Sequence, residues 1–113
     1  MVEVRFRRDE EGRLASVVAS GHANWAEAGD DVVCAAVAAL LQGAWLGLTE
    51  HARIEIKAER SKGNLALRWP KSARGRPDVE AIVGTAELAV AQIARQFGEH
   101  VRCMTEAETG DGV

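Results

Sequence analysis

The run DDVVCAAVAALLQGAWLGLT, residues 30–49, decides the fold class of this 113-residue chain. Its apolar side chains would lie almost all round a helix, which predicts a helix buried at the centre of a domain and ending near Thr49. Asp30 or Asp31 at its start is typical of an N-cap. Gln42 interrupts the run, which falls short of the roughly 20 apolar residues that a membrane span needs. We therefore expect no membrane partner.

Two predicted β-hairpins flank this helix. On its N-terminal side, residues 2–7 alternate apolar and charged side chains and residues 14–19 form the return strand, around a turn at residues 9–12. On its C-terminal side, residues 53–57 and 65–69 alternate in the same way. Period-2 alternation on both sides of a short polar turn indicates a hairpin with one buried face.

A second helix and a last strand complete the domain. Apolar residues recur at intervals of three and four from Asp78 onward, and Gly98 supplies a C-terminal stop. Residues 101–104 then read as a short strand. The order ββαββαβ predicts a single α+β domain, residues 1–104, with a mostly antiparallel sheet and two helices packed on one face. We expect residues 105–113 to form a polar, acidic and disordered tail.

Composition and charge limit the possible functions. The chain is 47% hydrophobic and 27% charged with a formal net charge of −3, which is ordinary for a globular protein. Residues 1–104 hold equal numbers of acids and bases, so nucleic acid is not expected as a primary partner. Residues 57–76 carry seven bases against one acid, a bias that fits a solvated hairpin better than an anionic partner. The absence of a signal-peptide pattern predicts a cytoplasmic protein with reduced thiols.

Cys34 has two interpretations. In an alanine-rich helix, a cysteine is usually a small buried hydrophobe. With the N-cap at Asp30 or Asp31, however, Cys34 lies in the first turn, where we expect an exposed side chain and where the helix dipole stabilises a thiolate. Such a nucleophile also needs a base within hydrogen-bond reach.

Three histidines could supply that base. His51 follows the predicted end of the helix, and His100 opens the last strand. His22 stands in the loop that leads back to the helix carrying Cys34, so this histidine alone has a local route to the cysteine. From spacing alone, the pair is a weak hypothesis.

The motif around these residues strengthens the hypothesis that His22 and Cys34 form a pair. Gly21-His22-Ala23, followed by Gly29-Asp30-Asp31-Val32-Val33-Cys34-Ala35-Ala36, closely resembles the signature of the ribosomal-processing cysteine proteases, the Prp or YsxB-like family. The resemblance implies that His22 and Cys34 are the catalytic pair. It also implies an endopeptidase that removes the N-terminal extension of a large-subunit ribosomal protein, a homodimer, and a mobile loop before the helix. The family often has Ser four residues after the cysteine, where this chain has Ala38, and the effect of that departure stays open.

The roles of the remaining candidate site residues stay open. Asp31 either caps the helix or orients His22, and we favour the cap. Gly21, Trp25 and Gly29 are candidate substrate-binding residues, although Trp25 could equally anchor the loop in the core. No Cys and His pair has zinc-ligand spacing, so we expect neither metal nor cofactor.

Two other classes of function compete with the protease. The first is a non-enzymatic ribosome- or RNA-associated module that binds through residues 57–76. The second is a thiol redox domain, which would need Cys103 as its resolving cysteine, whereas Cys103 lies on a strand with no base nearby in sequence and is expected to be structural.

Overall fold

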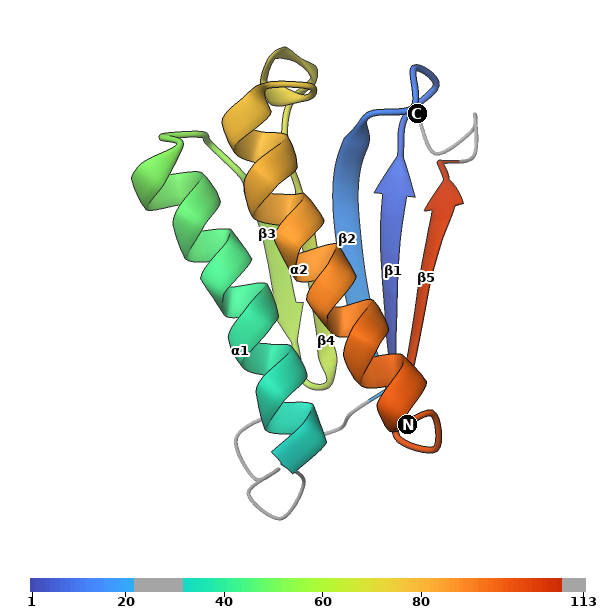
Figure 1. Ribbon diagram of the computed structural model, residues 1–113. Coiled ribbons are helices and arrows are strands. Elements are labelled where there is room, and N and C mark those ends of the chain that lie inside the picture. The colour runs from blue at the N-terminus through green and yellow to red at the C-terminus, as the bar shows by residue number, and fades with distance from the viewer. Residues whose placement is uncertain (22–31, 109–113) are drawn as a thin grey trace.

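A single five-stranded sheet forms one layer of the molecule, in the order β3-β4-β2-β1-β5 (Figure 1). The computed structural model describes residues 1–21 and 32–108. Neighbouring strands are antiparallel except for β1 and β5, which are parallel. The strands are β1 (Val2–Arg8), β2 (Leu14–Ser20), β3 (Lys57–Ser61), β4 (Asn64–Arg68) and β5 (Val101–Ala107).

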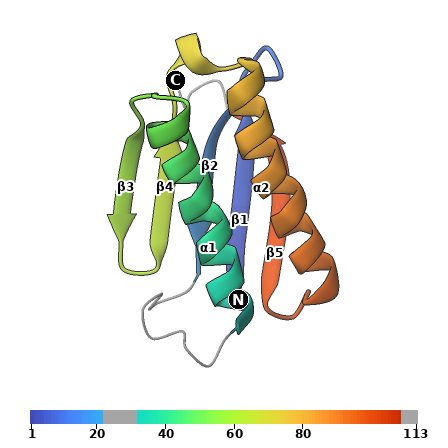
Figure 2. The same ribbon diagram turned by 60° about the vertical axis from the view of Figure 1, so that its left-hand side comes forward.

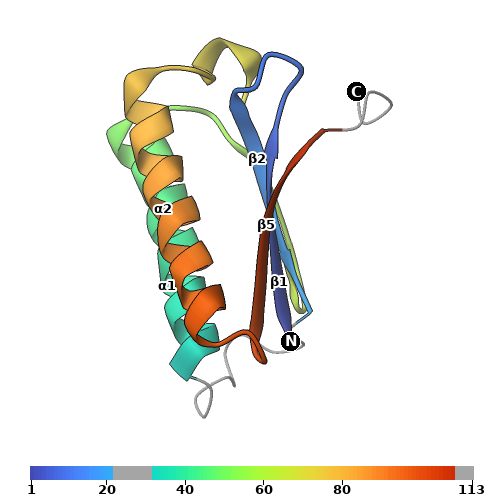
Figure 3. The ribbon, with the colours of Figure 1, turned by 45° about the vertical axis from the view of Figure 1, so that its right-hand side comes forward.

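Two helices form the second layer and cover one face of the sheet (Figure 3). They are α1 (Val32–Leu46), which continues as a π-helical segment η2 (Gly47–His51), and α2 (Pro77–Gln96), which follows the short 3₁₀ segment η3 (Lys71–Ala73). The predicted fold class and element order are confirmed.

The alternation in β1 explains why the helices lie on one face only. Val2, Val4 and Phe6 are fully buried, and they lie between the sheet and the helices because alternate strand residues share a face. Arg5 and Arg7 point to the open face, where both bind the carboxylate of Glu106 on β5, at 2.9 and 3.2 Å. The uncovered face of the sheet is therefore charged and solvated rather than apolar.

Helix α1 differs from its prediction in two ways. It is not buried all round, because Val32 and Leu46 are 77% and 61% exposed. The sheet and α2 cover two sides of this helix, and its outer side has no third layer among the described elements. The run Val32–His51 has 20 residues and, by length and composition, is long and apolar enough to cross a membrane. The prediction that this run is too short for a membrane span is therefore wrong. In this fold, its inner residues Val37 and Leu41 belong to the core.

The second hairpin starts later than predicted. Strand β3 begins at Lys57 rather than at residue 53, because Arg53 has a left-handed backbone with φ 59°. The backbone N–H of Ile54 donates to the carbonyl of Leu48 at 3.0 Å, so this segment bends around the end of the helix instead of joining the sheet. Ile54 is buried there. The alternation of apolar and charged residues at positions 53–57 thus reflects the burial of one side of this segment, although residues 53–56 do not pair as a strand.

The last strand is longer than predicted and removes part of the expected tail. Strand β5 extends to Ala107, which pairs with Arg8 of β1. Acids assigned to the tail bind bases of other strands: Glu106 binds Arg5 and Arg7, and Glu108 binds Arg68. Residues 105–108 therefore belong to the folded domain, and the rest of the predicted tail, residues 109–113, lies outside the described residues.

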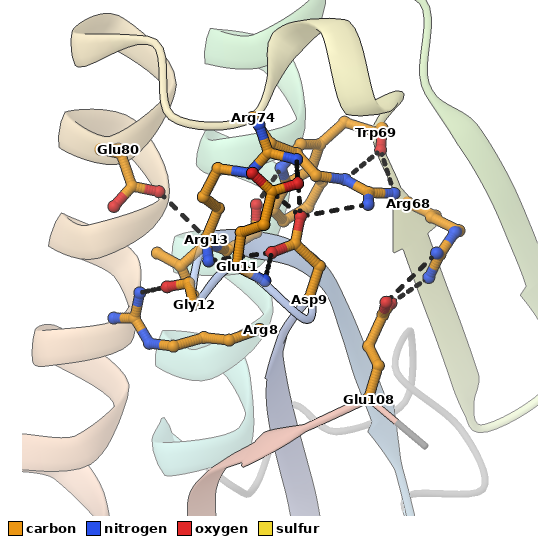
Figure 4. A network of polar contacts seen from close by, with 11 residues as sticks. Arg8, Asp9, Glu11, Gly12, Arg13, Arg68, Trp69, Arg74, Glu80 and Glu108 are labelled. Atoms are coloured by element: carbon orange, nitrogen blue, oxygen red, sulfur yellow. Dashed lines mark hydrogen bonds and ion pairs between the residues drawn. The ribbon is translucent and has the colours of Figure 1, made fainter. Parts of the chain in front are cut away.

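A buried polar network holds the end of the sheet where β1 turns into β2 (Figure 4). The Asp9 carboxylate accepts hydrogen bonds from the backbone N–H groups of Glu11 and Arg13, at 2.9 and 3.1 Å. Arg74, whose side chain is 3% exposed, lies 3.4 Å from the same carboxylate and donates to the Trp69 carbonyl at 3.0 and 3.1 Å. This network lies at the end of the molecule opposite the start of α1 (Figure 1).

Candidate active site

Cys34 is the third residue of α1 and lies in its first turn, as predicted. The end of β2 at Ser20 and the start of this helix lie at the same end of the molecule (Figure 2). The first backbone N–H groups of a helix have no partner within the helix and carry the positive end of its dipole. A thiolate or an oxyanion at this position is therefore electrostatically favoured.

The exposure predicted for Cys34 is wrong in this structure. The residue is 2% exposed and belongs to the hydrophobic core. The reason is tertiary packing, because the face of α1 that holds Cys34, Val37 and Leu41 lies against the sheet. A peptide carbonyl can reach the sulfur only after neighbouring chain moves away from it.

Gly21 has a backbone role at the end of β2. Its φ is 99°, a conformation that other residues rarely adopt. A Cβ at this position would lie 2.3 Å from the carbonyl oxygen of Met1, far inside van der Waals contact. Only glycine therefore permits the turn by which the chain leaves β2 toward the motif.

The other predicted site residues lie outside the described residues. These are His22, Trp25, Gly29 and Asp31. The pairing of His22 with Cys34, the role of Asp31 and the predicted mobility of the loop therefore stay predictions. His51 is described and ends η2, 17 residues after Cys34 in one continuous helical run, which places it about 25 Å along the axis from the cysteine.

Cys103 has the properties of a structural thiol. It is half-buried on β5 and forms no disulfide with Cys34. Burial, with a further contribution from the Glu87 carboxylate, raises the pKa of Cys103 to about 11. This thiol therefore stays protonated at neutral pH and is a poor nucleophile.

A depression lies beside the helix one turn beyond Cys34. It is lined by Ala38, Leu41 and Gln42 of α1 and by Arg60, Asn64 and Leu65 of the β3–β4 hairpin, and its cavity volume is only about 20 Å³. Sequence reasoning missed Arg60 and Asn64, because only the packing of the hairpin against α1 brings them to this helix. Within the described part of the chain, no group of three or more His, Cys, Asp or Glu residues could hold a metal ion.

Comparison with known proteins shows the family to which this chain belongs. The family model of the cysteine protease Prp matches residues 1–102. The ribosomal processing cysteine protease Prp of Staphylococcus aureus (strain Mu50 / ATCC 700699) is 29% identical over 105 residues, which cover 90% of this chain and 96% of that protein. The protein of the same name from Bacillus subtilis (strain 168) is 27% identical over 109 residues, covering 93% and 97%.

Solved structures share the fold. The S. aureus protease Prp with a covalently linked product peptide superposes with a TM-score of 0.80 at 22% identity, covering 93% of this chain and 99% of that one. SMU.848 from Streptococcus mutans gives a TM-score of 0.79 at 24% identity, covering 96% and 99%. At this identity, the structures support the fold alone.

Proposed function

This chain belongs to the cysteine protease Prp family, and we propose that it removes the N-terminal extension of a large-subunit ribosomal protein in the cytoplasm. Cys34 is the proposed nucleophile and His22 the proposed general base. The observation that carries this proposal is the position of Cys34, a residue of the matching motif, in the first turn of α1. The S. aureus relatives named as ribosomal processing proteases support the class of substrate.

The proposed reaction is acyl transfer through a thioester. The Cys34 thiolate attacks the scissile carbonyl, and backbone N–H groups at the start of α1 stabilise the oxyanion. Protonated His22 gives its proton to the leaving amine. His22 then takes a proton from the water that attacks the thioester, and the C–S bond breaks, which releases the acid product and restores the thiolate–imidazolium pair.

The burial of Cys34 adds a constraint to this reaction. A nucleophile that is 2% exposed cannot attack a peptide bond until the site opens. Binding of the correct substrate would supply the free energy for that opening, so selectivity would be gained at some cost in rate.

A cleavage assay tests the proposal directly. The extended ribosomal protein from the same genome is incubated with the wild-type chain, and the products are identified by mass spectrometry. Cleavage should be lost with Cys34→Ala and with His22→Ala. The control is Cys103→Ala, which removes the other, half-buried thiol by the same substitution and should retain cleavage. Normal cleavage by Cys34→Ala would refute the proposed nucleophile.

The alternative RNA-associated module is weakened by the ion pairs in residues 57–76. Three of the seven bases in this segment bind acids that lie outside it: Arg68 with Glu108, Arg74 with Asp9, and Arg76 with Asp78. The charge bias in the sequence is therefore partly neutralised in the fold. Salt-dependent binding of ribosomal RNA to Cys34→Ala, with micromolar affinity or better, would favour this alternative.

We also propose that the protein is a homodimer. Small and apolar residues line a shallow groove along the outer side of the two helices, namely Ala39, Leu40, Gly43, Ala44, Ala81, Ile82, Thr85 and Ala86. Leu46 and Leu88 are 61% and 72% exposed on the same two helices. A second copy of the chain would cover apolar surface that is otherwise in water.

A further inference from the structure

An open pocket of about 540 Å³ lies where strand β3 begins and strand β4 ends. It is at the end of the molecule opposite the start of α1 (Figure 1). Its walls come from residues 55–57, residues 68–70 and Arg74. The volume is within the range of small-molecule sites, about 300–1,000 Å³, and the proposed active site uses none of these residues.

Arg74 is the buried cation of this pocket, and part of its hydrogen-bonding capacity is unused. Its side chain is 3% exposed. Figure 4 shows its guanidinium between Asp9 and Trp69, with two hydrogen bonds to the Trp69 carbonyl and one to the Asp9 carboxylate. Because an arginine side chain has five N–H groups, two of them have no acceptor among the described residues. Spare donors on a buried cation favour an anion in the space beside it.

Two further cations line the same pocket. Lys57 lies directly opposite Arg68 in the β3–β4 pair, so their side chains share the open face of the sheet. Lys57 is exposed, and its side chain takes part in no ion pair or hydrogen bond within residues 1–21 and 32–108. Arg68 donates two hydrogen bonds to Glu108, which leaves three of its five N–H groups for another acceptor. The pocket therefore has unused donors from three different segments of the chain.

The rest of the lining indicates what the anion is attached to. Ile56 and Pro70 offer apolar surface, which an inorganic ion cannot use but an organic group can cover. Glu55 is the one acidic residue among the described residues that line the pocket. Its carboxylate opposes an anion, so its removal should strengthen binding.

We propose that this pocket binds a phosphate monoester, such as a nucleotide. Lys57, Arg68 and Arg74 would hold the phosphate, and Ile56 and Pro70 would contact the organic part. A phosphate monoester carries about 1.5 to 2 negative charges at neutral pH and has three acceptor oxygens, so it can accept hydrogen bonds from all three cations at once. A carboxylate has one charge and two oxygens, and it fits this set of donors less well.

Calorimetric titration of the 113-residue chain with AMP, GMP and ribose 5-phosphate tests the site. At least one of these probes should bind saturably at low ionic strength. The same compound without its phosphate should bind about tenfold more weakly, and inorganic phosphate should also bind more weakly than the ester. The proposal is overturned if none of the three probes binds saturably at low millimolar concentration, or if the phosphate makes no difference to affinity.

Charge variants locate the bound phosphate in this pocket. Lys57→Ala should weaken binding of the best probe by about fivefold, the size expected for an exposed ion pair, and Glu55→Gln should strengthen it. Lys62→Ala is the matched control, because it removes the same charge from the turn at the other end of the β3–β4 hairpin, outside the pocket. Equal weakening by Lys57→Ala and Lys62→Ala would indicate non-specific attraction and would overturn the site.

The titration of Cys34→Ala separates this pocket from the proposed active site. Because the pocket and the first turn of α1 lie at opposite ends of the molecule, the affinity for the probe should equal that of the wild type. Loss of binding in Cys34→Ala would place the phosphate at the active site and would overturn the inference. The proposed protease activity is not assumed at any step, so its failure would leave this site unaffected.

Discussion

At the scale of single residues, Gly21 lies at the end of β2, close to the backbone of the first residue of the chain. Both its φ of 99° and the approach of the Met1 carbonyl exclude a side chain. Gly12 offers a direct comparison, because its φ is 77° but a Cβ there would have no atom within 4 Å.

We expect Gly21→Ala to reduce the free energy of unfolding by more than Gly12→Ala does. Gly12→Ala adds only the backbone strain, about 1 to 2 kcal/mol, whereas Gly21→Ala adds a clash with the Met1 carbonyl as well. Urea denaturation of both variants measures the difference. Cleavage activity should also fall with Gly21→Ala alone, because this turn leads into the motif. Equal losses of stability would show that the close approach at Gly21 has no cost.

The two cysteines should differ in reactivity. Because the pKa of Cys103 is raised to about 11, its thiolate fraction at pH 7 is very small and rises only at strongly alkaline pH. Cys34 is 2% exposed, but whenever the site opens, a thiol at a helix start beside a histidine is expected to react faster. Iodoacetamide labelling at pH 7, followed by mass spectrometry of the digested protein, should therefore modify Cys34 before Cys103. Preferential labelling of Cys103 would contradict the proposed role of Cys34.

At the scale of elements, the Asp9 network connects the β1–β2 turn with the segment before α2. Burial acts to raise the pKa of Asp9, but hydrogen bonds from the backbone N–H groups of Arg13 and Glu11, together with the Arg13 guanidinium, outweigh it and lower the pKa to about 2. The charged carboxylate thus stabilises the folded state.

This shift predicts the pH dependence of stability. The folded pKa of Asp9 lies below its ordinary value of 3.8, so its contribution is present above about pH 4 and is lost as the pH falls toward 2. Asp9→Asn should lower the Tm at neutral pH and flatten its decrease between these values. Calorimetry at several pH values checks this, with Glu10→Gln, an exposed neighbour, as the control. If the Tm of Asp9→Asn falls with acid as much as that of the wild type, groups other than Asp9 cause the decrease.

At the scale of the whole molecule, the two-layer fold leaves the outer side of both helices uncovered. The groove between them is lined by residues such as Ala39 and Gly43. Within the described protomer, nothing packs near Gly43, because a Cβ there would have no atom within 4 Å. A larger side chain at Gly43 is therefore compatible with the folded protomer.

Sedimentation at micromolar concentration should show a dimer of the 12.1 kDa chain. Gly43→Glu should shift the protein toward monomer, because it places a charge in the groove that a second copy would bury. Gly84→Glu is the control, since Gly84 is also a helical glycine with open space but does not line the groove. A wild-type monomer at this concentration would refute the dimer, and dimers of Gly43→Glu would place the interface elsewhere.

The sequence by itself determined the features that depend on near neighbours. The alternation of Val2, Val4 and Phe6 identified the buried face of β1, and the apolar run after Asp31 placed Cys34 in the first turn of a helix. Both follow from periodicity within a few residues, since the spacing of apolar side chains selects helix or strand locally.

Only the tertiary structure decided the features that depend on distant partners. It placed Cys34 in the core, bound Arg68 to Glu108, and set Arg60 beside Ala38. The hydrogen bond from Ile54 to Leu48 at the end of the helix likewise kept residues 53–56 out of the sheet, although they alternate like a strand. The physical reason is that burial and ion pairing depend on which segments pack together, and periodicity within one segment carries no information about a partner 40 residues away.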